Sequence, residues 1–393
     1  MSATLDVLMA PSPATAGDIA VINLESTRRH AWSRFWHTPQ RPGLAEYIIE
    51  QEGLALAFLG DIGALDRLGF LAAQLAEMEG DSLRTSLVQA QVASATHRFA
   101  DAGRYLAQAQ RRGAPAATVN RLSMTIDQAC GTRLDLVLAA RRQAAAQTRR
   151  LEDQVPLGAL LADLREFEEA DEVYRRALRG YQDVSPFAMA WVCFQLGVLW
   201  GELASERQWA RAEQWYRQAV AYLPSYVKAR VHLAEIYVAD DRPRDAETLL
   251  IPVLSSADPE VCWRLADVMA SQGKLADAEA QMQAARSGFE RLLARHLLAF
   301  ADHGAEFYSG SGNDRRRALE LARINVANRP TLRAFEQAHA IACRAGDVDT
   351  ASELSVAATR RWGGAAFFRF SPLAEYRLQS AENGVASCGQ RAN

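Results

Sequence analysis

Histidine and carboxylate side chains are the groups most able to do chemistry in this chain, and their spacing forms no complete site. His296 and His303 stand two helical turns apart, with Asp302 and Glu306 beside them. A metal ion needs three or four converging ligands. The sequence therefore predicts surface or interhelical histidines here, and no metal site.

The cysteines are too scattered to form a disulfide framework or a zinc site. They are five in number and include no CxxC pair: Cys130, Cys193, Cys262, Cys343 and Cys388. An odd, scattered set of thiols is typical of a reducing compartment. The first residues contain no Lys or Arg before a short apolar run, which makes a poor secretory signal. We therefore expect a cytoplasmic protein.

Sequence patterns that mark common enzymes are missing. The chain contains no HExxH, GxSxG, GxGxxG or GxxxxGK[ST] pattern. Residues 309–313 read SGSGN, but no strand precedes them and no Lys follows as a phosphate loop would require. This segment is expected to be an insertion between two helices. The sequence predicts no catalytic residue, no cofactor and no enzyme activity.

Charge is close to balanced overall but uneven along the chain. The net charge is −3 and the pI is near 6.2, which gives no general reason to expect nucleic-acid binding. Residues 98–150 hold ten Arg and three Asp, whereas residues 151–175 hold eight acidic residues and two Arg. Solvated helix faces explain this pattern. The alternative is a regulatory protein that binds nucleic acid or an acidic partner through residues 98–150.

Helices must position these side chains, because the composition favours them throughout. Hydrophobic residues make up 49% of the chain and Ala and Leu are prominent. The most apolar run, residues 185–201, has no charged residue over 17 positions. It is shorter than the roughly 20 residues that cross a bilayer. We expect a buried helix there, and no transmembrane segment.

Small residues recur at a long period. Ala stands at the corresponding place of six apolar helix patterns: Ala170, Ala212, Ala246, Ala278, Ala318 and Ala351. The intervals run from 32 to 42 residues, and loop insertions are the expected cause of the two long ones. A small side chain lets two helices approach closely. The pattern predicts an all-α solenoid of antiparallel helix pairs, each stabilised by stacking on its neighbours.

The repeat resembles the tetratricopeptide repeat family over roughly residues 150–360. The unit Trp191–Pro224 is the closest, with matching residues at Leu196, Gly197, Ala212, Tyr216, Ala219 and Pro224. The pattern weakens before residue 150. A second helix of the repeat is still recognisable from Phe99, Ala102, Leu106 and Ala109, but no clean motif lies near Leu136. Residues 54–77 resemble another unit, in which Leu65 and Gly69 stand where the repeat has small residues.

Four segments follow from this pattern. Residues 1–43 are expected to form an N-terminal tail, disordered over 1–20, and a capping helix at residues 27–37. Residues 44–150 are predicted to be degenerate helical repeats, residues 151–360 true repeats, and residues 361–393 a C-terminal capping segment with a disordered tail. Because basic residues are interleaved with Trp32, Phe35 and Trp36 over residues 27–37, nucleic-acid or membrane-surface binding is the alternative to capping there.

The resemblance implies a concave groove, lined by the first helix of each pair, that holds a peptide or a partner helix. It places eight residues in or beside this groove: Trp191, Phe194, Lys228, His232, Glu235, Trp263, Arg264 and Asp267. Family members that grip a chaperone's C-terminal carboxylate use paired Lys and Asn at fixed first-helix positions. Here those positions hold Phe194, Val198, Val231, Glu235, Trp263 and Asp267, which argues against that role.

These observations together predict an interaction scaffold or adaptor in a bacterial-type cytoplasm. Its partner is expected to be a protein or peptide, with nucleic acid disfavoured by the overall charge.

Overall fold

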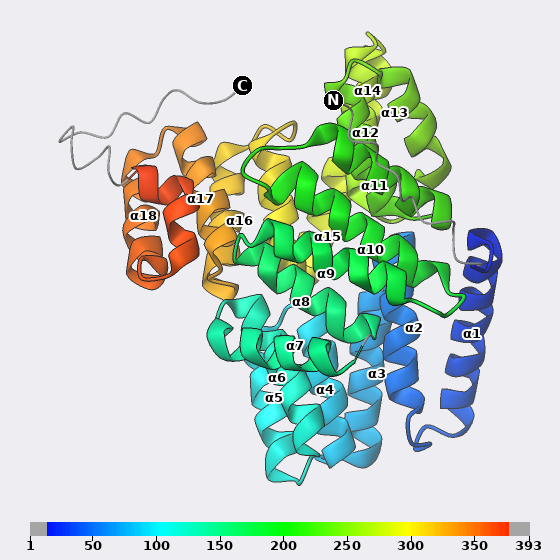
Figure 1. Cartoon of the computed structure of the whole chain (residues 1–393). Helices are drawn as coiled ribbons and strands as arrows, with labels where there is room; N and C mark the ends of the chain where they lie inside the picture. The colour runs from blue at the N-terminus through cyan, green and yellow to red at the C-terminus, as the bar shows by residue number, and fades with distance from the viewer. Residues whose placement is uncertain (1–13, 149, 377–393) are drawn as a thin grey trace. The chain divides into compact units, whose positions relative to one another are not determined.

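Every regular element that the structure describes is a helix. The computed structural model describes residues 14–148 and 150–376, and its helices follow one another along this part of the chain (Figure 1). This confirms the predicted all-α fold class. The predicted tail at residues 377–393 and the first thirteen residues lie outside the described part. Disorder predicted for residues 17–20 is wrong, because α1 begins at Gly17.

Two compact units share the chain, and each combines an early with a late segment. Unit 1 comprises residues 1–71 and 138–274, and unit 2 comprises residues 72–137 and 275–393. Along the chain, the boundary between the units falls inside α3 (Gly63–Glu79), inside α7 (Leu134–Gln147), and between residues 274 and 275. The predicted four-segment division, with boundaries after residues 43, 150 and 360, stays a prediction.

The remaining helices are assigned as follows. In unit 1 they are α1 (Gly17–His37), α2 (Leu44–Leu59), α8 (Leu151–Asp163), α9 (Phe167–Gly180), α10 (Pro186–Val198), η1 (Leu199–Leu203), α11 (Trp209–Tyr222), α12 (Val227–Ala239), α13 (Pro243–Leu250), η2 (Ile251–Val253) and α14 (Pro259–Ser271). In unit 2 they are α4 (Leu83–Ala95), α5 (Phe99–Arg111), α6 (Ala116–Cys130), α15 (Leu275–Ser309), α16 (Arg315–Asn328), α17 (Leu332–Ala345), α18 (Val348–Trp362) and η3 (Ala366–Phe370).

Within the units, helices pair as hairpins joined by short turns. The pairs are α8/α9, α10/α11 and α12/α13 in unit 1, and α4/α5, α15/α16 and α17/α18 in unit 2. Five of these six turns hold one residue with positive φ: His97, Arg165, Asp241, Asn313 and Gly346. A left-handed residue ends the first helix and reverses the chain within a few residues. The exception is α10/α11, where the five-residue π-helix η1 and a loop take its place.

Small residues allow the helices of a pair to touch. Ala170, Ala212 and Ala246 have no exposed surface, and the same holds for Ala318 and Ala351. The predicted contact positions are confirmed for these residues, and Ala278 is only 8% exposed.

Glycines on the first helices face tyrosines on the second. A Cβ built on Gly158 would lie 2.6 Å from the Tyr174 ring, and one built on Gly197 would overlap the Tyr216 ring. Both tyrosines are 1% exposed. Each Gly–Tyr pair thus brings a whole ring against the opposite backbone, which is the reason the sequence repeats Leu-Gly at these places.

Two sequence-based expectations about the repeats are wrong. The long interval between Ala278 and Ala318 comes from the long first part of α15, which runs from Leu275 to a kink at His296 (φ −136°, ψ 47°), and no loop insertion is needed. Because the kink falls at His296, His296 and His303 do not stand two turns apart on one straight helix. Gly69 is not a close-contact position, because nothing lies within 4 Å of a Cβ built on it.

In unit 1, the end of α2 packs against three successive first helices. We call residues 58–62 the Gly60 turn. Phe58 is 4% exposed, and its ring centroid lies 5.2 Å from that of Phe187 in α10 and 4.7 Å from that of Tyr226 at the start of α12. A Cβ built on Gly60 would lie 3.2 Å from Asp258, which caps α14. These early residues therefore complete the core of later hairpins.

Unit 2 shows the same kind of long-range packing. The Asn328 amide donates a hydrogen bond to the His97 carbonyl over 3.0 Å. Arg361 donates to the carbonyls of Cys130 and Gly131, each over 3.1 Å. The early helices α4 to α6 thus contact the ends of α16 and α18.

The predicted terminal elements are partly as expected. The capping helix is ten residues longer than residues 27–37, and Ala31 and Phe35 are buried on its inner face. At the other end, Phe368 is buried in η3 and Phe367 contacts Trp362 at 5.6 Å between ring centroids. Phe370 is 53% exposed, so it does not join this packing.

One stretch of the described residues, Pro186–Leu203, has the length and composition of a membrane span. It comprises α10 and η1, and 67% of it is buried in the protein. The central helix of a packed core gives the same signal, so this stretch is weak support for a span. Its burial matches the buried helix predicted for residues 185–201.

Candidate partner-binding surface

Three successive first helices of unit 1 carry all the residues that the sequence placed in a groove. Helix α10 supplies two of them, α12 three and α14 three. Because the hairpins stack in order, these helices are neighbours in the unit. Six of the eight side chains are half-buried and reach the surface: Trp191, Lys228, His232, Glu235, Arg264 and Asp267.

The other two, Phe194 and Trp263, are buried. Phe194 is 8% exposed and lies among the rings of Tyr216, Tyr226 and His232, with centroid distances of 5.2 to 5.6 Å. Trp263 is 3% exposed. Rings enclosed in this way stabilise the unit and offer little surface to a partner.

Charged side chains from these hairpins form a connected row. His232 Nδ1 lies 2.7 Å from Glu202 Oε1 and 3.8 Å from Glu235 Oε2. Glu235 also pairs with Arg264 of the next hairpin. The Arg264 guanidinium lies 3.6 Å from the centroid of the Trp263 ring. We call Glu202, His232, Glu235 and Arg264 the charged row.

The charged row holds a protonated imidazole near neutral pH. Burial alone would lower the pKa of His232, but the carboxylates of Glu202, Glu235 and Glu260 outweigh it and raise this pKa to about 9. Its Tyr216 neighbour donates a hydrogen bond to the same Glu202 oxygen over 3.0 Å. The row therefore alternates in sign, with two carboxylates and two cations.

Sequence reasoning missed Glu202. It is the first acidic residue after a run of uncharged positions, and it falls in η1, where the π-helical turn changes the direction of the side chain. A single carboxylate at the end of a long apolar run indicates that this carboxylate pairs with a cationic side chain in the folded protein. Its partner on α12, 30 positions later, was not deducible from spacing alone.

A buried carboxylate, Asp171, joins α9 to the next hairpin. Asp171 Oδ1 accepts hydrogen bonds from Trp200 Nε1 and from Arg211, both over 2.8 Å. Its other oxygen accepts from Arg175 over 2.6 Å. By contrast Glu166, Glu168 and Glu169 are exposed, as the sequence predicted for a solvated face. Asp171 is therefore a structural group.

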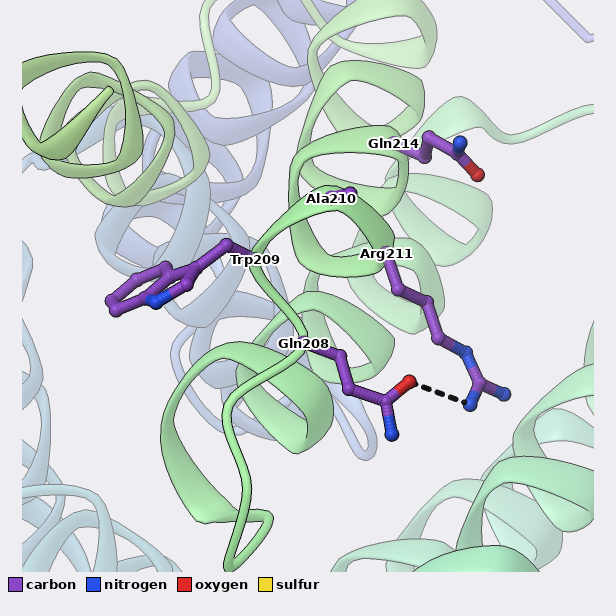
Figure 2. A pocket seen from close by; sticks show the side chains of 5 residues that line it. All are labelled: Gln208, Trp209, Ala210, Arg211 and Gln214. Atoms are coloured by element: carbon purple, nitrogen blue, oxygen red, sulfur yellow. Dashed lines mark hydrogen bonds between the residues drawn. The ribbon is translucent and has the colours of Figure 1, made fainter. Parts of the chain in front are cut away.

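A surface pocket of about 370 Å³ lies at the start of α11. Its lining is Gln208, Trp209, Ala210, Arg211 and Gln214. Figure 2 shows Trp209 pointing away from Arg211 and Gln214, while the Arg211 guanidinium donates to the side-chain amide oxygen Oε1 of Gln208 over 3.4 Å. Arg211 is already held by Asp171. None of the five lining residues is a carboxylate, histidine or thiol, so this pocket has no group for acid–base or nucleophilic chemistry.

Arginines of residues 98–150 are largely paired within the protein. Arg98 and Arg104 both pair with Asp101, and Arg133 pairs with Asp127. Further pairs join Arg112 to Asp81, Arg142 to Glu169 and Arg150 to Glu152. This pairing reduces the positive charge that the region offers to a nucleic acid. Across residues 14–148 and 150–376, no cluster of three His, Cys, Asp or Glu side chains could hold a metal ion.

Comparison with known proteins places one segment in a family. Residues 203–258, from the end of η1 to the cap of α14, match the tetratricopeptide repeat model. No curated protein matches the sequence significantly.

Several solved structures are similar at low identity. A chain of the APC/C hetero-tetramer Cut9–Hcn1 has a TM-score of 0.47 and 14% identity, over 72% of this chain and 54% of that one. This chain thus spans about half the length of that relative. The C-terminal part of a repeat protein from Cytophaga hutchinsonii gives 0.31 and 13% over 75% and 97%. Yeast Tom70 gives 0.32 and 12% over 93% and 98%.

TM-scores below 0.5 say nothing about the function of this chain. The family match covers α11 and the α12/α13 hairpin, which include the buried contact residues Ala212, Tyr216 and Ala246. Residues 203–258 are therefore a tetratricopeptide repeat segment within a longer series of helix hairpins.

Proposed function

We propose that the chain is a protein-interaction scaffold and that its partner binds along the first helices α10, α12 and α14. The charged row is the observation that carries this proposal. Its four side chains come from η1, α12 and α14, lie in contact, and keep 20% to 34% of their surface exposed. Ordered charges of alternating sign on stacked repeats give a partner a fixed register.

Apolar and charged side chains beside the row would add affinity. Trp191 on α10 is half-buried, and a ring held by its base offers apolar area at little entropic cost. Lys228 on α12 is half-buried too, and it adds a cation near the start of the helix. We therefore propose a peptide or helix that brings both apolar and acidic side chains.

The compartment is part of this proposal. Cys130, Cys193, Cys262 and Cys343 are free thiols, and burial raises the pKa of Cys193 far above its usual value. Buried, protonated thiols are compatible with a reducing cytoplasm.

Affinity capture with mass spectrometry tests the proposal. The double variant Trp191→Ala/Lys228→Ala removes half-buried groups from the first helices. Trp209→Ala/Arg217→Ala likewise removes one tryptophan and one cation, from the exposed side of α11, and is the matched control. We expect the first variant to lose partners that the control retains, with unchanged helicity by circular dichroism. Equal capture by both variants and the wild type would contradict binding at the first helices.

A further inference from the structure

The first two helices of unit 1 contact three successive turns that join the later hairpins. The Thr15 amide donates a hydrogen bond to the Val184 carbonyl over 2.8 Å, in the turn before α10. A Cβ built on Gly17 would lie 2.7 Å from Pro224, in the turn before α12. The Gly60 turn packs as closely on the residues before α14. We call residues 15–62 the N-terminal clamp, because they hold all three turns.

Ion pairs fasten the parts of the clamp to one another. Arg28 on α1 donates to Glu52 on α2 over 2.8 Å and to Asp61 in the Gly60 turn over 2.7 Å. Arg67 on α3 donates to the same two carboxylates over 2.7 to 3.0 Å. Because Glu52 is only 1% exposed, water screens these contacts little. The two helices and the turn are therefore held together as one body.

The charged row joins the same later elements at a second place. Its ion pairs run from η1, which continues α10, to α12 and then to α14. Arg264 stands six residues after Asp258, the α14 cap that the Gly60 turn contacts, which is about 9 Å along the helix. A rotation of one hairpin against the next would separate the paired charges and weaken their attraction. The clamp and the charged row thus bridge the same two joints between first helices.

We infer that docking of the N-terminal clamp and closure of the charged row are coupled, so that the clamp regulates the first helices proposed above as the binding site. A docked clamp fixes the angle between successive hairpins at which the row closes. When the clamp is released, the hairpins rotate about their turns and the row opens. Coupling of this kind is reciprocal, so a partner that binds the closed row also favours the docked clamp. Only this last statement rests on the proposed function.

Release of the clamp leaves the later hairpins with contacts of their own. The clamp adds four side chains to their shared core: Ala20, Leu24, Ala55 and Phe58. Within a hairpin the glycine–tyrosine contacts remain, such as that of Gly197 with Tyr216. A segment near a chain end that adds few core residues opens at a lower free energy than the whole domain unfolds. The clamp therefore opens as a separate unit.

Added methyl groups that release the clamp test the coupling. Gly17→Ala/Gly60→Ala places two Cβ atoms 2.7 and 3.2 Å from atoms of the turns. Gly43→Ala/Gly53→Ala is the matched control, because Gly43 has a positive φ as Gly60 does and nothing lies within 4 Å of a Cβ at either control position. Hydrogen exchange of the full chain, measured by mass spectrometry, should increase in α1 and α2 of the first variant while α11 and α13 stay protected.

The titration of His232 reports whether the row is closed. NMR of the full chain with ¹³C-labelled histidine, assigned with His232→Gln, gives its midpoint. We expect a midpoint of about 9 in the wild type, because the carboxylates of Glu202, Glu235 and Glu260 raise the pKa of this imidazole. Glu202 and Glu260 belong to neighbouring elements and move away when the hairpins rotate. The glycine variant should lower the midpoint by about one unit or more, and the control should leave it unchanged.

A reciprocal variant opens the row instead of the clamp. Glu235→Gln removes the carboxylate that pairs with both His232 and Arg264. It should increase amide exchange in the Gly60 turn about tenfold. Asp240→Asn is the control, because Asp240 is exposed at the end of α12 and pairs with Arg242 of its own hairpin. This arm of the experiment holds even if the glycine variant folds poorly.

Four outcomes would overturn the inference. The first is unchanged exchange in α1 and α2 of the glycine variant, since the turns would then not hold the clamp. The second is faster exchange there with an unchanged His232 midpoint. The third is exchange that increases equally in α1, α2, α11 and α13, which would make the clamp part of one cooperative core. The last is unchanged exchange in the Gly60 turn of Glu235→Gln.

The coupling and the proposed function can fail separately. Both measurements use the chain without a partner, so they do not depend on what Trp191→Ala/Lys228→Ala captures. Equal capture by that variant and the wild type would remove the binding site and leave the coupling. An uncoupled clamp would leave the binding site without this regulation.

Discussion

Glu52 is the most completely buried carboxylate described in unit 1, and its neighbours keep it ionised. Burial alone would raise its pKa, but hydrogen bonds from Arg67, Arg28 and Trp32 lower it below the usual 4.5. A lowered pKa in the folded state means that the charge stabilises the protein above pH 4.5. This stabilisation is lost as the pH falls through the lower, folded-state pKa.

Replacing Glu52 by Gln should destabilise the protein by about 2 kcal/mol, because Arg28 and Arg67 would lose their shared acceptor. Urea unfolding at pH 7 measures the change, and the difference from the wild type should shrink as the pH is lowered below 4.5. Glu50→Gln, an exposed change on the same helix, should stay within about 0.5 kcal/mol of the wild type. Equal effects of the two variants would contradict the role of the buried network.

His232 should show the opposite pH dependence. Because its folded-state pKa, about 9, exceeds its usual 6.5, its charge stabilises the protein fully below pH 6.5. That contribution is lost as the pH rises to 9.

His232→Gln should therefore cost on the order of 2 kcal/mol at pH 6 and much less at pH 9.5. Chemical unfolding of both proteins across this range gives the comparison, and the exposed His37→Gln is the control. A difference that is constant with pH, or that grows toward alkaline pH, would rule out a charged His232 between its carboxylates.

At the scale of helices, the closest contacts are those of glycine with tyrosine. Gly197→Ala should cost roughly 1–3 kcal/mol, because its new methyl group overlaps the buried Tyr216 ring. Gly53→Ala on α2 has no atom within 4 Å and should instead stabilise its helix by about 0.5–1 kcal/mol. Thermal unfolding of the two variants measures both changes in stability. Shifts of the same sign would mean that helix propensity, and not the ring contact, governs both positions.

Helix pairs were predictable because one side chain in each pair has to be small. Ala170, Ala212 and Ala246 stand out in an apolar pattern, and the structure buries each of them completely. The turns were less visible, since the left-handed residue is His, Arg, Asp, Asn or Gly in different hairpins. Glycine is favoured there but not required, so no single residue type marks the position.

Contacts between distant segments were not predictable. The pattern around Phe58 indicates a helix with a buried face, but nothing in it names Phe187 or Tyr226 as partners. The same limit applied to the candidate site. The family resemblance placed its residues on first helices, where the structure has them, while the burial of Trp263 and the pairing of His232 with Glu202 depend on neighbouring hairpins.

At the scale of the molecule, the Gly60 turn joins the first 71 residues of unit 1 to the later hairpins. Phe58→Ala should cost about 3–5 kcal/mol through the cavity it leaves. It should also increase amide hydrogen exchange at the starts of α10 and α12, which Phe58 covers. Phe370→Ala, an exposed phenylalanine in unit 2, should change neither property. Increased exchange confined to α2 would show that the turn does not stabilise the later hairpins.

The Gly60 turn is synthesised long before some of the residues that it contacts. Phe58 leaves the exit tunnel about two hundred residues before Asp258, which completes the surface that receives the turn. At the usual elongation rate this gap lasts roughly 10–40 s. During that interval the Gly60 turn lacks part of the surface that covers it in the folded protein, so we expect chaperones that bind emerging chains to recognise this segment.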